Sequence, residues 1–454
     1  MANKSLLTYG SKLFSVESVY FSPVVTIPPD YKTISSLYFF LSKVEPWSDD
    51  NNPDTPVQTQ KYLKQVCKNI FIVKHITSGD ISPVIKRVDW SSGTTYDYYK
   101  DDDDMFRLDS NGYPVLSFYI KNRYDQVFKC LWNNNDSAST VEPYFEPGAY
   151  GTNNIYTGSD GYKWKYIYTI DTALKNKFMD TSWMPIPATK GTVNPLQSTA
   201  GYGNIDVINV VNGGSGYDPA NAIISVAITG DGTGAAATAY SSNGRITKIE
   251  VNNTGTNYTY ANVAISSAKG SGALAISPVS PIGGHGFEVE SELGCYHVMI
   301  TSQFSGSESG LLPTGINYHQ VGILNSPVTL SSPGDIANGA IYKTTTDLIV
   351  SSGFGVYQSN EYIYQGNSIN DNIFIGKILS FDPASNVVKL INTKGTLSIN
   401  SPVFGDSSKT TRTLLSYSTP EFITLSGNIF YLENRSAIER SSDGIEQFKV
   451  VLRY

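Results

Sequence analysis

The side chains best suited to catalysis or metal binding are few and widely spaced along the chain. The four histidines are His75, His285, His297 and His319. No two of them have the HxxxH or HExxH spacing that brings two imidazoles to one metal from a helix face. His285 has glycines on both sides, which favours a position in a loop over metal ligation. The histidines therefore predict no metal site.

A nucleophile and a base could meet at Cys295 and His297, because residues two apart in a strand point to the same face. Nothing else in the sequence supports this pair, and no serine lies in a GxSxG elbow. A packing role for Cys295 is favoured. Cys130 lies in an apolar, strand-like run and is also predicted to be a core residue.

The acidic residues show no pattern that specifies a reaction. Glycoside hydrolysis needs two carboxylates, and the candidates have no distinguishing spacing: Glu142, Glu146, Glu288, Glu290 and Glu292. The run from Asp101 to Asp104 lacks the alternating ligands and the glycine of a calcium loop, so a solvated loop is favoured. For the Gly-rich run at 213–216 a tight turn joining strands is favoured over a phosphate loop, because no amphipathic helix follows it. We expect no cofactor and no enzymatic activity.

Composition narrows the class of protein further. The 454 residues include 33 Lys+Arg against 40 Asp+Glu, a net charge of −7, with no basic patch for direct nucleic-acid binding. The 31 tyrosines are typical of half-buried sheet surfaces and interfaces. Three distant cysteines predict reduced thiols in a protein made in the cytoplasm. The N-terminus resembles no signal peptide and no long apolar run occurs, so we expect a soluble protein without membrane insertion.

Local patterns predict strands and two helices. Alternating apolar residues at 37–41 and 166–170 predict strands. Helical spacing predicts a helix over about 57–70 and a shorter one over about 172–179, with Asp171 as its N-cap. Residues 427–454 read as two strands joined by a polar loop, and the apolar end at 448–454 is expected to pair in a sheet.

An internal repeat lies in a segment rich in Gly, Ala, Asn, Ser and Thr at 196–281. An offset of 258 − 217 = 41 places Ile208–Tyr217 on Ile249–Tyr258. The same offset places Ala220, Asn221, Ile224 and Ser225 on Ala261, Asn262, Ile265 and Ser266. Two copies are too few for a propeller or solenoid, so we expect a compact β module of two related halves joined by tight glycine turns. Strand-like runs at 331–419, including Gly339–Tyr342, predict a small barrel or sandwich.

Six segments, taken in order, resemble one family. They are Val44–Ser48, Val84–Trp90, Val127–Leu131, Asp160–Tyr166, Leu312–Gly315 with Val321–Pro327, and Ile429–Arg435. In this order they resemble the baseplate wedge protein called gene product eight in T-even-type, contractile-tailed bacteriophages. The resemblance covers 1–195, 282–330 and 420–454, while 196–281 and 331–419 have no counterpart in the shorter family version.

The resemblance implies a mainly β fold with a β-sandwich core and short helical excursions. In this interpretation the wedge core comprises 1–195, 282–330 and the C-terminal strands at 420–454. A Gly-rich repeat module at 196–281 and a barrel or sandwich module at 331–419 are then insertions. Insertions are best tolerated in exposed loops of an existing fold.

The resemblance also implies a function. The chain would be a structural subunit of the virion tail baseplate, a homodimer that holds other wedge proteins together during virus assembly in the host cytoplasm. Candidate interface residues from the family segments are Glu45, Pro46, Trp47, Asp89, Trp90, Trp164, Glu433, Asn434 and Arg435. For any single tryptophan a core role is favoured. The alternative function is a tail-associated spike or protein that binds host-surface glycans, with the two insertions contacting the host.

Overall fold

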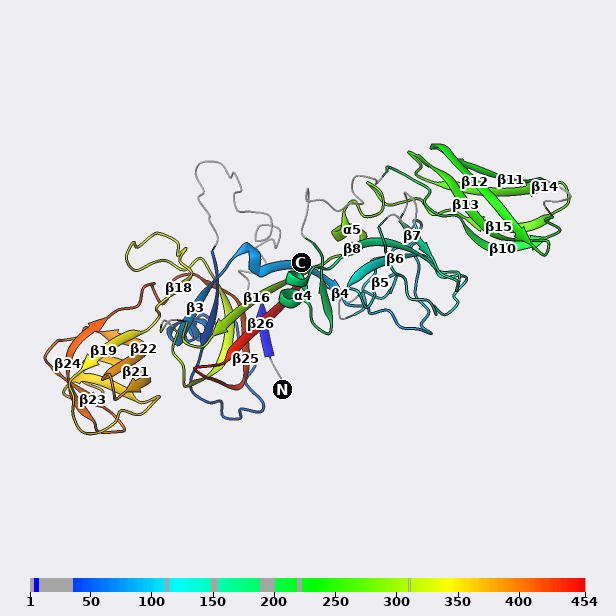
Figure 1. The fold of residues 1–454 in the computed structure, drawn as a ribbon. Helices are drawn as coiled ribbons and strands as arrows, with labels where there is room; N and C mark the ends of the chain where they lie inside the picture. Colours follow the sequence, from blue (N-terminus) through cyan, green and yellow to red (C-terminus); the bar gives the residue numbers. More distant parts are fainter. Residues whose placement is uncertain are drawn as a thin grey trace. The chain divides into compact units, whose positions relative to one another are not determined.

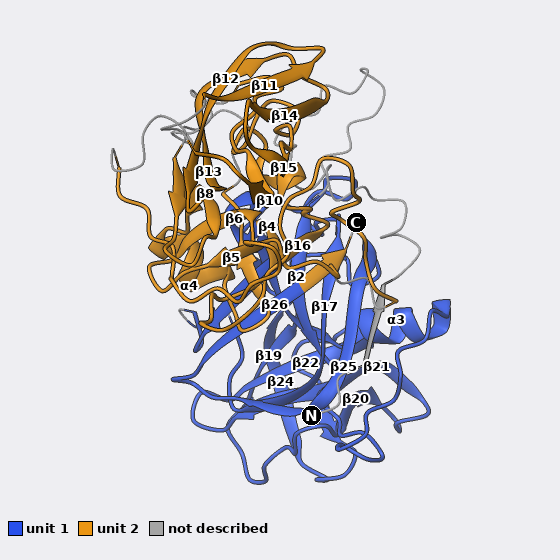
Figure 2. Cartoon of the chain, turned by 90° about the vertical axis from the view of Figure 1, so that its right-hand side faces the viewer, with its two compact units in different colours: residues 1–81, 300–450, 454 blue, residues 82–299, 451–453 orange. Residues whose placement is uncertain are grey.

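The computed structural model describes residues 4–7, 36–110, 114–147, 154–187, 201–218, 223–308, 310 and 312–453. Strands make up 47% and helices 6%, in several antiparallel sheets that include a six-stranded barrel, which confirms the predicted mainly β fold. The chain divides into two compact units (Figure 2). Unit 1 comprises 1–81, 300–450 and 454, and unit 2 comprises 82–299 and 451–453.

Unit 1 contains a six-stranded antiparallel sheet in the order β1-β25-β17-β2-β3-β18. Three of its strands, β3, β18 and β25, are labelled in Figure 1. Its strands are β1 (Lys4–Leu7), β2 (Leu37–Ser42), β3 (Ile70–Ile76), β17 (Ile316–Asn325), β18 (Ile341–Tyr342) and β25 (Asn428–Arg440). Every residue of β2 is buried, as its continuous apolar sequence predicts. Gly322 pairs with Phe40 of β2, and a Cβ there would lie 2.4 Å from the Phe40 ring. Only glycine allows this close packing.

The first predicted helix is confirmed as α3 (Gln60–Lys68). It starts after Thr59, whose hydroxyl accepts a hydrogen bond from Tyr62 N, so the N-cap sets the boundary inside the predicted range. Val66 of α3 packs with Phe40 and Leu432 in one buried cluster. A 3₁₀ turn, η1 (Ser78–Asp80), follows β3.

A closed barrel in the order β19-β22-β21-β20-β23-β24 also belongs to unit 1. Its strands are β19 (Thr346–Val350), β20 (Tyr362–Gly366), β21 (Asn372–Asp382), β22 (Val387–Gly395), β23 (Pro402–Gly405) and β24 (Thr411–Ser418). They enclose their own core, which includes Leu348, Ile378 and Leu414. The placement of Gly339–Tyr342 in this module was wrong. Tyr342 pairs with Val73 of β3, because β18 extends the larger sheet.

The chain segments that lead into and out of the barrel are hydrogen-bonded to each other. Lys343 N donates to Glu421 Oε2 at 2.6 Å, and Glu421 N donates to Lys343 O at 2.8 Å. A short loop could therefore join them. We predict that replacing 344–420 by a short Gly/Ser loop leaves the six-stranded sheet able to unfold cooperatively, since the barrel core is separate. Circular dichroism during heating checks this, and loss of the cooperative transition would contradict it.

In unit 2 a four-stranded sheet has the order β5-β6-β8-β7. Its strands are β5 (Tyr119–Lys121), β6 (Gln126–Trp132), β7 (Ile155–Thr157) and β8 (Lys163–Thr169). All residues of β6 are buried. The second predicted helix is confirmed as α4 (Thr172–Phe178), with the Asp171 carboxylate accepting from Leu174 N at 2.9 Å.

Another four-stranded sheet has the order β26-β16-β4-β9. Its strands are β4 (Ile81–Lys86), β9 (Trp183–Pro185), β16 (His297–Ser305) and β26 (Ile445–Arg453). The short helix α5 (Val289–Glu292) precedes β16. The two predicted C-terminal strands are confirmed, although they belong to different sheets: β25 pairs with β17, and β26 neighbours β16.

The repeat module of unit 2 contains three two-stranded pairs, β10-β15, β11-β14 and β12-β13. The strands are β10 (Asn209–Ser215), β11 (Ile224–Gly230), β12 (Thr233–Ser242), β13 (Arg245–Thr256), β14 (Ala261–Ser267) and β15 (Ser271–Ile276). Each pair takes one strand from β10–β12 and one from β13–β15. The two halves are thus related by an approximate two-fold arrangement.

Equivalent residues of the two halves make equivalent contacts. The Tyr217 hydroxyl accepts from Ala273 N at 3.4 Å, and the Tyr258 hydroxyl accepts from Ala235 N at 3.4 Å. Gly214 lies within β10, which corrects its assignment to a turn. Its φ of +62 and its close approach to Ser271 O require glycine. The repeat positions 220 and 221 lie outside the described residues.

Candidate functional sites

Two family segments from opposite parts of the chain meet in unit 1. Trp47, in the connection after β2, donates from Nε1 to the backbone oxygen of Arg435 in β25 at 2.9 Å, across 388 residues of sequence. The Lys43 ammonium lies 4.3 Å from the centre of the Trp47 ring. The indole is therefore fixed at both its edge and its face.

Asn434 is the centre of the hydrogen bonds in this region. Its side chain is fully buried and donates from Nδ2 to Asp54 O at 2.6 Å and to the Tyr62 hydroxyl at 2.9 Å. Its Oδ1 accepts from Gln320 Nε2 at 2.8 Å. These bonds join β25, β17, α3 and the connection before α3. The side chain of Asn434 thus stabilises the packing of these elements within unit 1.

The neighbours of Asn434 divide between interior and surface. Glu433 is buried and accepts from the Tyr431 hydroxyl at 2.8 Å. Arg435 lies 3.6 Å from the Glu433 carboxylate and is half-buried. Pro46 is exposed, and Glu45 forms an ion pair with Lys377 of β21 in the barrel. A cavity of about 490 Å³ lies beside Trp47 and α3.

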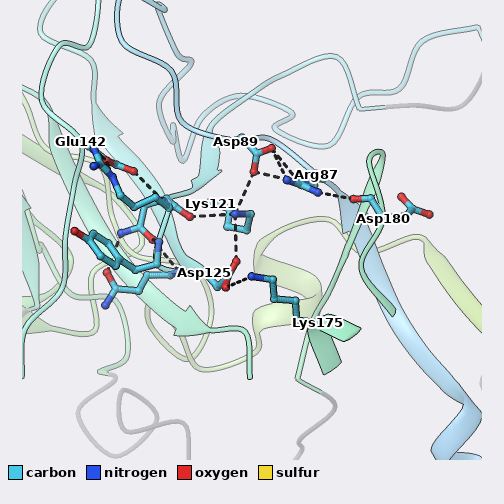
Figure 3. A network of polar contacts seen from close by, with 11 residues as sticks. Arg87, Asp89, Lys121, Asp125, Glu142, Lys175 and Asp180 are labelled. Carbon is cyan, nitrogen blue, oxygen red and sulfur yellow. Dashed lines mark hydrogen bonds and ion pairs between the residues drawn. The ribbon is translucent and has the colours of Figure 1, made fainter. Parts of the chain in front are cut away.

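In unit 2, positively and negatively charged side chains alternate in a network of ion pairs that includes the family residue Asp89 (Figure 3). Arg87 Nε donates to the Asp89 carboxylate at 2.9 Å, and Lys121 Nζ lies 3.2 Å from the same carboxylate. Lys121 also lies 3.3 Å from Asp125, which pairs with Lys175 of α4 at 2.7 Å. This ion-pair network links β5 and α4 to the segment after β4.

The residues of this ion-pair network differ in how deeply they are buried. Burial raises the pKa of Asp89, but the Arg87 hydrogen bond and the Lys121 charge outweigh it and lower that pKa overall. The Lys121 side chain is only 7% exposed, so its ion pairs are screened less than those of a surface lysine. Trp90 donates from Nε1 to Ser139 Oγ at 3.0 Å and is half-buried.

Trp164 does not reach the surface of the chain. Its side chain is 0% exposed, and its ring is stacked on Tyr162 and meets Tyr96 edge-on. This burial agrees with the core role that the sequence analysis favours for any single tryptophan. Of the nine candidates, Glu433 and Asn434 are also buried, and six keep accessible surface: Glu45, Pro46, Trp47, Asp89, Trp90 and Arg435.

A buried ionic cluster in unit 2 joins residues that sequence analysis treated separately. Glu292 Oε1 lies 3.0 Å from Lys129 Nζ and 2.6 Å from His285 Nδ1, while Glu292 Oε2 accepts from Gly286 N at 2.5 Å. Lys129 Nζ also lies 3.7 Å from the centre of the Tyr99 ring. Side-chain exposure is 1% for Lys129 and 2% for Glu292.

The pKa shifts in this cluster follow from burial and mutual charge. Burial would raise the pKa of Glu292, but Lys129 and His285 outweigh it and bring it to about 2. Burial and the Lys129 charge lower the pKa of His285, so we expect a neutral imidazole that donates from Nδ1 to Glu292. Burial lowers the pKa of Lys129, and Glu292 opposes that shift. Both oxygens of the Glu292 carboxylate thus have hydrogen-bond donors, as expected of a group that stabilises the fold.

Sequence reasoning missed Lys129, although a signal was present. Lys129 interrupts the apolar run Val127–Leu131, all of which is buried in β6. A lysine inside a fully buried strand needs an acidic partner, because an unpaired buried charge is costly. Its partner Glu292 lies 163 residues away, so no local pattern identifies it.

The other chemical candidates have structural partners. The Cys295 thiol lies 3.4 Å from both Val84 O and His297 O, which agrees with the favoured packing role. The His297 ring lies against Trp183, with ring centres 4.4 Å apart. In the acidic run Asp101 accepts from Val279 N at 2.9 Å. Within the described parts of the chain, no group of three or more His, Cys, Asp or Glu side chains could hold a metal ion.

None of the helices in the described residues has the length and apolar character needed to cross a membrane. No family model matches the chain, and no curated protein matches it.

Proposed function

We propose that this chain is a non-enzymatic structural subunit of the baseplate wedge of a contractile bacteriophage tail. In this proposal it forms a homodimer and binds other wedge proteins of the virion. The main support is the direct contact between Trp47 and Arg435, which belong to the first and last of the six family segments. The first and last of these segments, far apart in the sequence, are thus in contact within unit 1.

The arrangement of the insertions supports the same proposal. The barrel strands span 346–418 and enclose a core of their own. The repeat module likewise has its own core cluster, which includes Tyr217 and Tyr258. Its chain ends are adjacent, with Ser280 N donating to Asn204 O at 2.9 Å. Both modules therefore have the form of insertions into loops of a separate framework.

A wedge subunit needs a stiff framework and accessible anchor residues. The buried Lys129–Glu292 pair and the Asn434 hydrogen bonds each join several elements within a unit. Trp47, Trp90 and Arg435 keep accessible surface. Tryptophan and arginine are the residue types that most often dominate interface energies. We assign the contacts with wedge neighbours to the surroundings of these three residues.

Light scattering of the purified full chain tests the proposal. We expect a mass of twice 49.5 kDa for the chain alone, and a larger complex after mixing with other wedge proteins of the same phage. An unrelated acidic protein serves as the control and should leave the mass unchanged. A monomer that stays a monomer in the presence of those wedge proteins would overturn the assignment.

A further inference from the structure

Six large apolar side chains are exposed on and beside strand β24 of the barrel. Phe354 is fully exposed, and the other five keep between 39% and 60% of their surface. Single exposed apolar residues are common on monomeric proteins, but a contiguous group marks an interaction surface. We call this group the barrel patch: Ile349, Phe354, Val356, Ile399, Leu415 and Tyr417.

Backbone pairing brings the segments of the barrel patch together. Ile349 of β19 pairs with Ser416 of β24, so Leu415 lies beside Ile349. The segment 399–401 is also hydrogen-bonded to β24, because its central amide donates to Leu414 O at 2.8 Å. The patch therefore extends over three neighbouring segments of the barrel.

The loop that carries Phe354 is fixed to β24 by a buried arginine. Arg412 is only 5% exposed and donates from Nη1 to Ser351 O at 3.0 Å. Its Nη2 donates to Gly353 O at 3.0 Å and to Gly355 O at 2.8 Å, on either side of Phe354. An ordered loop loses less conformational entropy when a partner binds. Burial of the Phe354 ring against a partner would also recover its hydrophobic free energy.

The charges around the barrel patch favour a partner with the same surface. Residues 351–360 contain no charged side chain. Asp347 of β19 lies 3.4 Å from Lys389 and 3.9 Å from Lys343, so its charge is already paired. In a two-fold dimer each patch meets an identical patch, and an unpaired charge in it would meet a like charge. The barrel patch avoids this repulsion, whereas a strongly charged partner would find no opposite charge in it.

We propose that the barrel patch is the surface on which a second copy of this chain binds, with the two patches facing each other across a two-fold axis. Phe354 is the anchor residue of this contact, and Arg412 positions it. The inference rests on the homodimer of the proposed function and names the surface that forms it. That surface lies within 331–419, which has no counterpart in the shorter family version, so the resemblance does not supply it.

Sedimentation equilibrium of the full chain tests the proposal. We expect Phe354→Ala to raise the dimer dissociation constant at least about thirtyfold, since both copies lose the anchor. Ile373→Ala is the matched control, because Ile373 is exposed on β21 of the same barrel but outside the patch. It should change that constant less than about twofold. Thermal unfolding of both variants should match that of the unchanged chain, because neither side chain is buried.

The possible results distinguish this surface from the wedge role as a whole. A Phe354→Ala dimer as stable as that of the unchanged chain would overturn the inference and leave the wedge role untouched. An intact dimer that no longer binds other wedge proteins would assign the patch to a wedge neighbour, which also overturns the inference. An unchanged chain that is a monomer would contradict the homodimer itself, and with it the surface named here.

Discussion

Replacing Glu292 by glutamine is expected to lower the free energy of unfolding of unit 2 by roughly 3–5 kcal/mol. The substitution keeps the shape of the side chain but removes its charge. Lys129 then remains 1% exposed without its counterion, and the Gly286 N–H and His285 lose a charged acceptor. Urea unfolding followed by tryptophan fluorescence measures the effect, because Trp90, Trp132, Trp164 and Trp183 all lie in unit 2.

Two comparisons separate the loss of the ion pair from other effects of this substitution. Glu288→Gln makes the same change at an exposed position four residues earlier, and should alter stability by less than about 0.5 kcal/mol. The double variant Lys129→Met with Glu292→Leu removes both charges and should recover most of the loss. A Glu292→Gln protein as stable as the unchanged chain would show that the cluster does not brace the unit.

The same pair makes stability depend on acid in a defined direction. The pKa of Glu292 in the folded chain is about 2, below its ordinary value of 4.5. Its contribution is therefore complete above about pH 4.5 and is lost as the pH falls towards 2. Glu292→Gln lacks this titration, so its stability should change less between pH 5 and pH 3 than that of the unchanged chain.

Local sequence patterns were sufficient for elements that depend on neighbours in the chain. The Asp171 cap and the apolar spacing of α3 each act within one or two turns, and both helices appear where the sequence predicts them. The 41-residue repeat could be recognised in the sequence because each half contains its own set of strand-forming residues. Its pairing, which joins β10 to β15, depends on residues about 60 positions apart and has no local signature.

Long-range partners explain what the sequence did not reveal. Gly339–Tyr342 contains apolar strand-forming residues, as the barrel strands do. Its place in the larger sheet depends on pairing with β3, which lies far away in the sequence. Glu433 and Asn434 look like surface residues because they are polar. Their burial depends on donors and acceptors from β17, α3 and β25, which the fold supplies.

Replacing Asn434 by leucine is expected to lower the stability of the six-stranded sheet by about 3 kcal/mol. Leucine has a similar size, so packing changes little, but Asp54 O, the Tyr62 hydroxyl and Gln320 Nε2 each lose a hydrogen bond to Asn434. Tyr62 and Gln320 keep only the bond between them. Hydrogen exchange of the β25 and β17 amides measures the effect within unit 1. Faster exchange of both strands is the expected result.

Asn428→Leu is the matched control, because it makes the same change at an exposed position of β25. We expect it to leave amide exchange nearly unchanged, since an exposed asparagine has water as its partner. If both substitutions had the same small effect, the Asn434 hydrogen bonds would contribute little to the sheet, and this family residue would need another explanation. A large effect of Asn434→Leu alone would place the family segment 429–435 in the framework that positions Trp47 and Arg435, which any wedge contact at those two residues requires.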